Sequence, residues 1–175
     1  MPRIEPLKEQ DASPEQKEAI AQELRARGRM TNLKWIQAHS PAALRIYGEW
    51  FALKAELSPV IGDRAIFIFS LAISEAQDAT IPVGFFRRAL SGIGAHPDHL
   101  QPTESEALLQ RFGSALGQNN ARQVPDDIWA ALHETYDTVT LANLVAFAGI
   151  MVATTVFANL VQAEPDADVL PFLKP

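Results

Sequence analysis

The feature that most constrains the fold is a long uncharged run in the C-terminal part of the chain. From Thr138 to Ala163 there is no acidic or basic side chain, and a run of this length is sufficient to span a bilayer. Polar residues such as Asn143 and Asn159 interrupt the run, and no Lys or Arg flanks either end, where membrane anchors usually lie. We therefore expect a helix buried in a helical core or an oligomer interface, and no membrane span.

Small residues recur along this run at three- and four-residue spacing. Ala142, Ala146, Gly149 and Ala153 form a seam that lets another helix approach closely. A helix this apolar carries more apolar surface than a monomer usually exposes. The sequence therefore predicts a soluble homo-oligomer with this helix in the core or at the subunit contact.

Helix-start signals recur throughout the chain. Ser13-Pro14 with Gln16 is a capping box with proline at the first helical position, and Thr103 with Glu106 is a second box. Ser40-Pro41, Ser58-Pro59 and Pro125 are further starts. Pro82 fits the first turn of a helix that begins at Thr80 or Ile81. We expect helices over 14–27, 32–38, 41–57, 59–75, 81–90, 104–116, 125–136 and 138–163.

Strand signals are nearly absent. Ala65–Ile73 has β propensity, but it lies in a longer run behind a helix start, and the length favours a helix. With 175 residues and short connections, the sequence predicts a single all-α domain over 1–175, built as a multi-helix bundle.

Composition excludes several classes of function. The chain has no cysteine, which rules out disulfides, thiolate metal sites and dithiol redox chemistry. Its net charge of −6 argues against nucleic acid and against anionic membrane surfaces as partners. The first sixteen residues have no apolar signal-peptide core. A cytoplasmic location is the resulting expectation.

Three segments carry a family resemblance: the central RAIFIFSLAISEAQDATIPVGFFRRAL (Arg64–Leu90), GRMTNLKWIQAHSPAALRIY (Gly28–Tyr47), and the closing pair of helices, Val124–Asp166. Over roughly Ile4–Pro165 the chain resembles the carboxymuconolactone decarboxylase and alkyl hydroperoxidase D superfamily. That resemblance implies a helical bundle of the alkyl hydroperoxidase D-like type and a homo-oligomer, often a trimer or hexamer.

The reactive groups of the peroxidase branch are missing from this sequence. Its members carry a Glu, then Cys-x-x-Cys, then a His. Alignment to that pattern puts Arg64 at the Glu, Ala76 and Ala79 at the two Cys, Asp78 between them and Val83 at the His. The decarboxylase branch has a His near 81–90, and this chain has none between His39 and His96. We expect a degenerate active site without thiol peroxidase activity.

Glu75, Asp78 and Arg64 are the candidate catalytic residues. Glu75 and Asp78 are three residues apart, so that two carboxylates buried together could share a proton and supply a general acid. The simpler alternative is that they are ordinary helix-end residues, Asp78 capping the following helix. Arg64 would pair with them or clamp a substrate carboxylate; the equal alternative is a surface arginine in the first turns of its helix. About 16 Å of helix separates Arg64 from Glu75.

His96, Asp98 and His99 resemble a metal cluster, but they lie in a Gly- and Pro-rich loop without a remote third ligand, so we expect a solvated loop. No metal or other cofactor is predicted.

Two functions stay open. One is a cofactor-free acid/base enzyme, lyase or decarboxylase-like, acting on a small organic acid. The other is a non-catalytic oligomeric binding or structural protein whose ancestral pocket is filled by Ala76, Ala79 and Val83. An open polar cavity near Ala76 and Ala79 would favour the enzyme, and a packed apolar one the second function.

Overall fold

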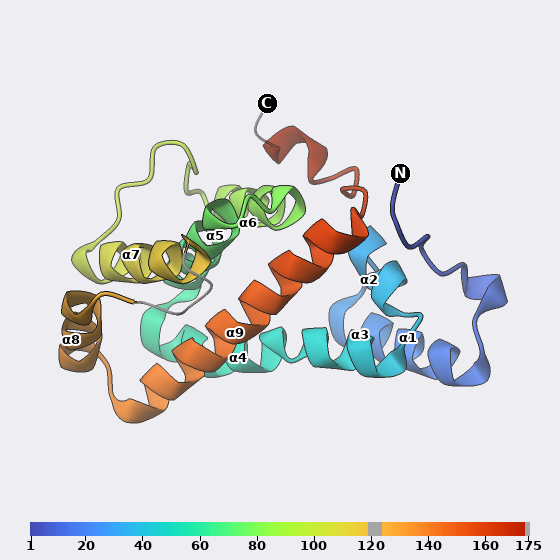
Figure 1. The fold of residues 1–175 in the computed structure, drawn as a ribbon, viewed down its shortest axis with the longest axis horizontal. Helices are drawn as coiled ribbons and strands as arrows, with labels where there is room; N and C mark the ends of the chain where they lie inside the picture. Colours follow the sequence, from blue (N-terminus) through green and yellow to red (C-terminus); the bar gives the residue numbers. More distant parts are fainter. Residues whose placement is uncertain (119–123, 174–175) are drawn as a thin grey trace.

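The computed structural model describes residues 1–118 and 124–173, and every regular element in those ranges is helical (Figure 1). This confirms the predicted all-α, multi-helix bundle. The elements are η1 (Glu9–Asp11), α1 (Pro14–Arg27), α2 (Asn32–Gln37), α3 (Pro41–Gly48), α4 (Trp50–Ile61), α5 (Asp63–Ala76), α6 (Thr80–Gly92), α7 (Glu104–Gln118), α8 (Asp126–Thr135), α9 (Thr138–Val161) and η2 (Leu170–Phe172).

Both predicted capping boxes are present. The Ser13 hydroxyl accepts from the Gln16 amide at 3.2 Å, and the Gln16 side chain accepts from the Ser13 amide at 2.8 Å. At the start of α7 the Thr103 amide donates to Glu106 at 2.8 Å, and the Glu106 amide donates to the Thr103 hydroxyl at 3.3 Å. Each box satisfies two amides that have no partner within the helix.

The predicted helix over 41–57 is in fact two helices, α3 and α4. The amide of Glu49, between them, bonds back three residues to Ile46 at 3.2 Å. This tighter turn follows Gly48, a poor helix former.

The predicted helix start at Ser58-Pro59 is wrong. Pro59 lies in the last turn of α4, and Gly62, with φ of 80°, separates α4 from α5. Glycine populates this region without the steric cost that a Cβ imposes. The Ser58 hydroxyl donates to Asp63 at 2.6 Å instead of capping a helix. The apolar helix therefore starts at Asp63, and Ala65–Ile73 is helical as expected.

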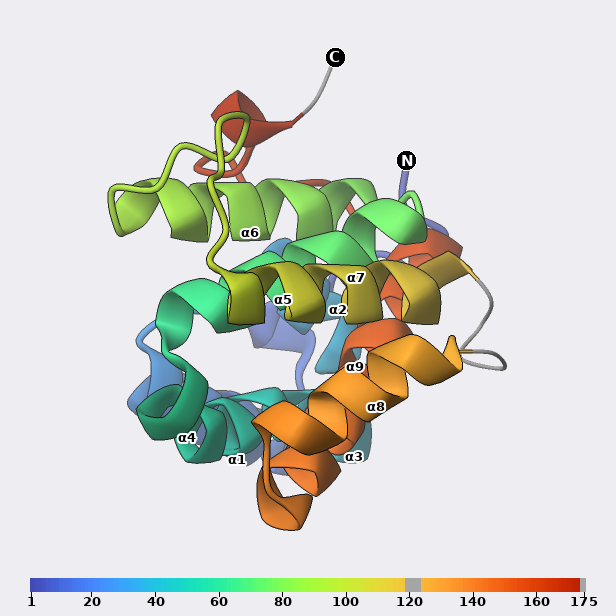
Figure 2. The same cartoon turned by 90° about the vertical axis from the view of Figure 1, so that its left-hand side faces the viewer.

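Helix α5 is the centre of the molecule, and it packs against α4, α6, α7 and α9. Figure 2 shows α6 above α5 and α7, with α1, α3 and α4 at the bottom. The approach of α7 to α5 is close because glycines face α5. A Cβ on Gly113 would lie 2.8 Å from the carbonyl oxygen of Phe69 and 3.1 Å from the Cβ of Ala72. Close packing lets Phe69 and Phe112 stack with ring centroids 5.4 Å apart.

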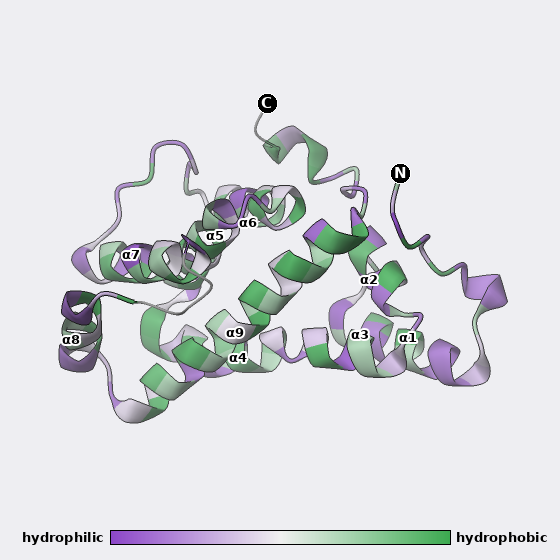
Figure 3. Cartoon of the chain, in the orientation of Figure 1, coloured by the Kyte–Doolittle hydropathy of each residue, from purple (hydrophilic) through white to green (hydrophobic). Residues whose placement is uncertain are grey.

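Helix α9 crosses the molecule diagonally from α8 toward α2 (Figure 1). One face, including Leu144, Phe147 and Met151, is buried against α4 and α5. The opposite face is exposed and apolar, and Figure 3 shows mainly hydrophobic colouring along the helix. This outer face of α9 consists of Ala142, Val145, Ala146, Gly149, Ala153, Val156 and Leu160.

Among the described residues, α9 is the one helix that is long and apolar enough to cross a membrane by length and composition. Within the chain, 39% of its most apolar window is buried. Its packing against α4 and α5 is consistent with a soluble protein.

After α9 the chain turns back toward α6, and residues 163–173 form what we call the C-terminal strap. Val169 and Leu173 pack on Gly84 of α6, where an added Cβ would lie 2.6 Å from both side chains. The strap is also tied to α6 by a hydrogen bond of 3.0 Å from Arg87 to the Phe172 carbonyl. It thereby brings the end of the described chain over the space between α2 and α6.

Candidate functional site

Arg64 lies in the first turn of α5 and binds the start of α7. Its guanidinium pairs with the Glu106 carboxylate and donates to the Gln101 carbonyl at 3.2 Å. Burial alone would raise the pKa of Glu106, but the bonds from the Thr103 amide and from Arg64 outweigh burial and lower it. Arg64 therefore joins two helices and is engaged away from Glu75, which is at the opposite end of the 14-residue helix.

Glu75 and Asp78 follow each other across the link between α5 and α6. Glu75 is half-buried and Asp78 is exposed, with a left-handed φ of 49°. Asp78 is not the N-cap of α6, because that position is Ala79 and no side chain caps it. The residue that organises the link is Gln77: the Thr155 hydroxyl donates to its side chain and Asn159 donates to its carbonyl at 3.1 Å. These contacts give two polar residues of α9 their partners.

Ala76 and Ala79, which the resemblance aligns with two cysteines, are closely packed. Ala79 is fully buried and Val83 is buried. Ala76 lies against Gly117 of α7, where a Cβ would overlap Ala76 and would approach the Ile73 carbonyl oxygen to 2.9 Å.

The His96 loop forms no metal site in the described part of the chain, where no group of three metal-binding side chains is found. Asp98 instead pairs with Arg87 at 2.8 Å, and the two imidazoles lie beside each other with centroids 4.8 Å apart.

The candidate site is a cavity of about 260 Å³ between α2, α4, α6 and α9. Its wall is largely aromatic and aliphatic, which suits an apolar ligand. The apolar lining residues are Leu33, Tyr47, Trp50, Phe51, Ile81, Pro82, Phe85, Phe86, Met151 and Val169. Glu75, Asp78 and Arg64 are not among the residues that line this cavity.

A few polar groups interrupt the apolar wall. Gln37 lines the cavity and is only 4% exposed. Trp50 also lines it, and among the described residues its buried indole N–H has no hydrogen-bond partner. An unpaired buried donor costs about 1–3 kcal/mol. Burial raises the pKa of the Tyr47 hydroxyl, which keeps it a neutral donor. Tyr47 thus supplies a neutral donor beside a mainly apolar surface, whereas the Trp50 N–H is enclosed.

Basic side chains gather at the cavity, although the whole protein is acidic. The lining includes Arg27, Arg29, Lys34 and Arg88 but a single carboxylate, Asp166. The Arg27 guanidinium lies 4.0 Å from the centre of the Phe51 ring. Lys34 pairs with Glu23 of α1.

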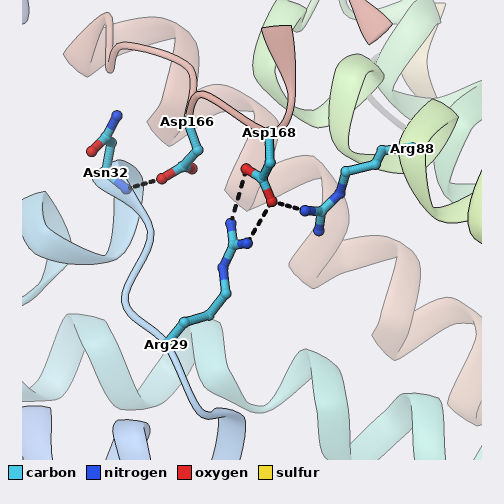
Figure 4. Close-up of polar contacts among 5 residues, drawn as sticks. All are labelled: Arg29, Asn32, Arg88, Asp166 and Asp168. Carbon is cyan, nitrogen blue, oxygen red and sulfur yellow. Dashed lines mark hydrogen bonds and ion pairs between the residues drawn. The ribbon is translucent and has the colours of Figure 1, made fainter. Parts of the chain in front are cut away.

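The C-terminal strap supplies two carboxylates, Asp166 and Asp168, at the mouth of the cavity (Figure 4). Asp168 binds Arg29 at 2.6 Å and also pairs with Arg88 of α6. Asp166 accepts from the Asn32 amide at 3.0 Å. Asn32 in turn donates to the carbonyl of Glu164 at 3.2 Å. The strap therefore joins α2 and α6 across the cavity.

Sequence reasoning missed this site because its residues come from three distant segments. The nearest local signal is Phe85-Phe86-Arg87-Arg88 in α6, where Phe86 and Arg87 are buried and Arg88 pairs with Asp168. Nothing in the spacing of Arg29 and Asp168 indicates that they meet.

Comparison with known proteins does not assign the chain: no family model matches it, and no curated protein does.

Proposed function

We propose that this protein binds a small, mainly apolar molecule in the cavity between α2, α4, α6 and α9, and that it does so without catalysis. The observation that carries the proposal is the aromatic wall around a volume of about 260 Å³. A space of this size suits one small ligand rather than a peptide.

The absence of catalysis is proposed from the placement of the candidate acid/base groups. Arg64 is engaged with Glu106, and Asp78 is exposed to solvent. The packed positions Ala76 and Ala79 also support the binding function, as expected for a filled ancestral pocket. The acid/base enzyme on a small organic acid stays a prediction that this geometry does not favour. Membership of the alkyl hydroperoxidase D-like family also stays a prediction.

A neutral fluorescent probe tests binding. N-phenyl-1-naphthylamine brightens when it leaves water for an apolar site, and we expect saturable binding to the wild-type chain. Thr154 lines the cavity, so Thr154→Trp should fill it and weaken binding at least tenfold. Thr138→Trp is the matched control, because Thr138 is exposed at the first turn of the same helix. Failure of the wild type to bind, or equal binding by both variants, would contradict the proposal.

We also propose that the chain is a cytoplasmic homo-oligomer that associates through the outer face of α9. At 100° per residue the seven residues of this face fall within about 100° of one another. Leu160 on this face is 59% exposed, and Gly149 has open space around it. A face made of small residues fits a second copy of itself closely.

Light scattering tests this association. We expect an oligomer at micromolar concentration, and Gly149→Leu should loosen it by overpacking a close helix crossing. A monodisperse wild-type monomer would refute the oligomer. Recovery of the chain only with detergent would instead assign the outer face of α9 to a membrane.

A further inference from the structure

We infer that the ligand of the cavity is a carboxylate, and that its carboxylate replaces Asp168 between Arg29 and Arg88. This inference rests on the proposed function, because it names the chemical class of the molecule that the cavity binds. Asp168, which lies in the C-terminal strap, then competes with the ligand for the two guanidiniums.

The geometry already fits one carboxylate. Asp168 Oδ2 lies 2.6 Å from Nη1 of Arg29, and Oδ1 lies 3.4 Å from Nη2 of the same guanidinium. Oδ2 also accepts from Nη1 of Arg88 (Figure 4). One carboxylate therefore bridges two guanidiniums that belong to separate parts of the chain. Arginine favours such planar, two-point recognition of carboxylates.

The geometry of the mouth suits an anion at this position, because Arg29 and Arg88 both donate to one oxygen of Asp168. Burial and the neighbouring charge of Arg29 lower the pKa of Arg88, whereas the charge of Asp166 raises it. Asp166, the carboxylate in the lining, is engaged with the Asn32 amide. If Asp168 moves away, the two guanidiniums lose the carboxylate that they share, and a ligand in the cavity can supply another.

Asp168 is suited to exchange. Its side chain is 41% exposed, and ion pairs that reach solvent contribute little to stability. The strap is held independently on both sides of Asp168, by Asn32 at Glu164 and by Arg87 at Phe172. The Asp168 side chain can therefore turn out to solvent while the strap stays in place.

The aromatic lining of the cavity indicates the chemistry of the ligand's apolar part. Tyr47, Trp50, Phe51, Phe85 and Phe86 all line the cavity. Aromatic rings pack edge-to-face or offset against other rings. An arene carboxylate, with one or two rings and one acidic group, matches both the wall and the mouth.

The test compares 2-naphthoate with its neutral isostere 2-naphthamide, each displacing N-phenyl-1-naphthylamine. On the wild type we expect naphthoate to bind more weakly as salt rises, because ions screen a partly exposed charge pair, and naphthamide to be unaffected. Asp168→Asn should strengthen naphthoate binding at least fivefold and leave naphthamide within twofold. Asp127→Asn is the matched control: Asp127 is an exposed carboxylate that pairs with Arg111 and does not line the cavity.

The outcomes separate the two proposals. If both naphthalenes displace the probe but neither salt nor Asp168→Asn distinguishes them, the carboxylate inference is wrong and the cavity still binds apolar ligands. If neither the probe nor the naphthalenes bind to the wild type or to Asp168→Asn, the proposed function fails and the inference fails with it. The salt dependence is measured on the wild type, so it decides the matter even if the variant does not fold.

Discussion

The contact between α5 and α7 predicts that a single methyl group at Gly113 destabilises the protein. The added Cβ of Gly113→Ala would lie 2.8 Å from the Phe69 carbonyl oxygen and 3.1 Å from the Cβ of Ala72. Ordinary contacts begin near 3.4 Å, so the backbones must separate by about 0.6 Å (3.4 − 2.8). A gap of that order forfeits about a quarter of the dispersion energy of the contacts it opens.

The expected net loss is about 1–2 kcal/mol. Overpacking costs about 1–3 kcal/mol, and replacing glycine by alanine within a helix returns up to about 1 kcal/mol. For a chain of this size, such a loss lowers the melting temperature by roughly 2–8 °C. Gly92→Ala is the matched control, because Gly92 ends α6 and nothing lies within 4 Å of its added Cβ. It should lose no stability.

Thermal and urea unfolding, followed by circular dichroism, measure both variants. If Gly113→Ala is as stable as the wild type while Gly92→Ala behaves as expected, α7 does not approach α5 as closely as described. The claim that Gly113 allows α7 to approach α5 closely would then be refuted.

Three further results are expected. Folding lowers the pKa of Glu106 from 4.5. The stability that its charge contributes is therefore complete above about pH 4.5 and is lost as the pH falls through the folded-state pKa. Glu106→Gln should be less stable than the wild type in urea at neutral pH, and the difference should shrink in acid. Asp78→Asn should leave the melting temperature unchanged, whereas Asp78→Val should lose about 1–2 kcal/mol, since a branched side chain is strained at φ of 49°; equal melting temperatures would contradict this. Without cysteine the chain should not reduce cumene hydroperoxide in a dithiol-coupled assay, and turnover above a buffer blank would show otherwise.

The helical fold was predictable from local signals. The capping box at Ser13 placed the start of α1 correctly, because a cap is a contact among neighbouring residues. The same logic failed at Ser58, whose hydroxyl bonds to a later residue, Asp63, in the turn that ends α4. A Ser-Pro pair has the same appearance in both settings, and only the left-handed turn at Gly62 distinguishes them.

The site was less predictable because it depends on contacts between distant residues. Arg64 was expected either to pair with Glu75 or Asp78 or to be a surface arginine, and its partner is Glu106 of another helix. A carboxylate pair three residues apart, such as Glu75 and Asp78, suggests proximity only if the helix continues, and here it ends at Ala76. The cavity itself needs the chain to return from α9 to Arg29, which no periodicity encodes.

The wide sequence separation of the cavity wall has a consequence for how the protein folds. Helices α5, α6 and α7 are consecutive, so their contacts close short loops, whereas the bridge from Arg29 to Asp168 closes a loop of 139 residues. Short loops cost less entropy and form earlier. A refolding chain therefore has a compact helical centre before it has a binding site. A ligand bound between Arg29 and the strap would therefore stabilise contacts that form late in folding.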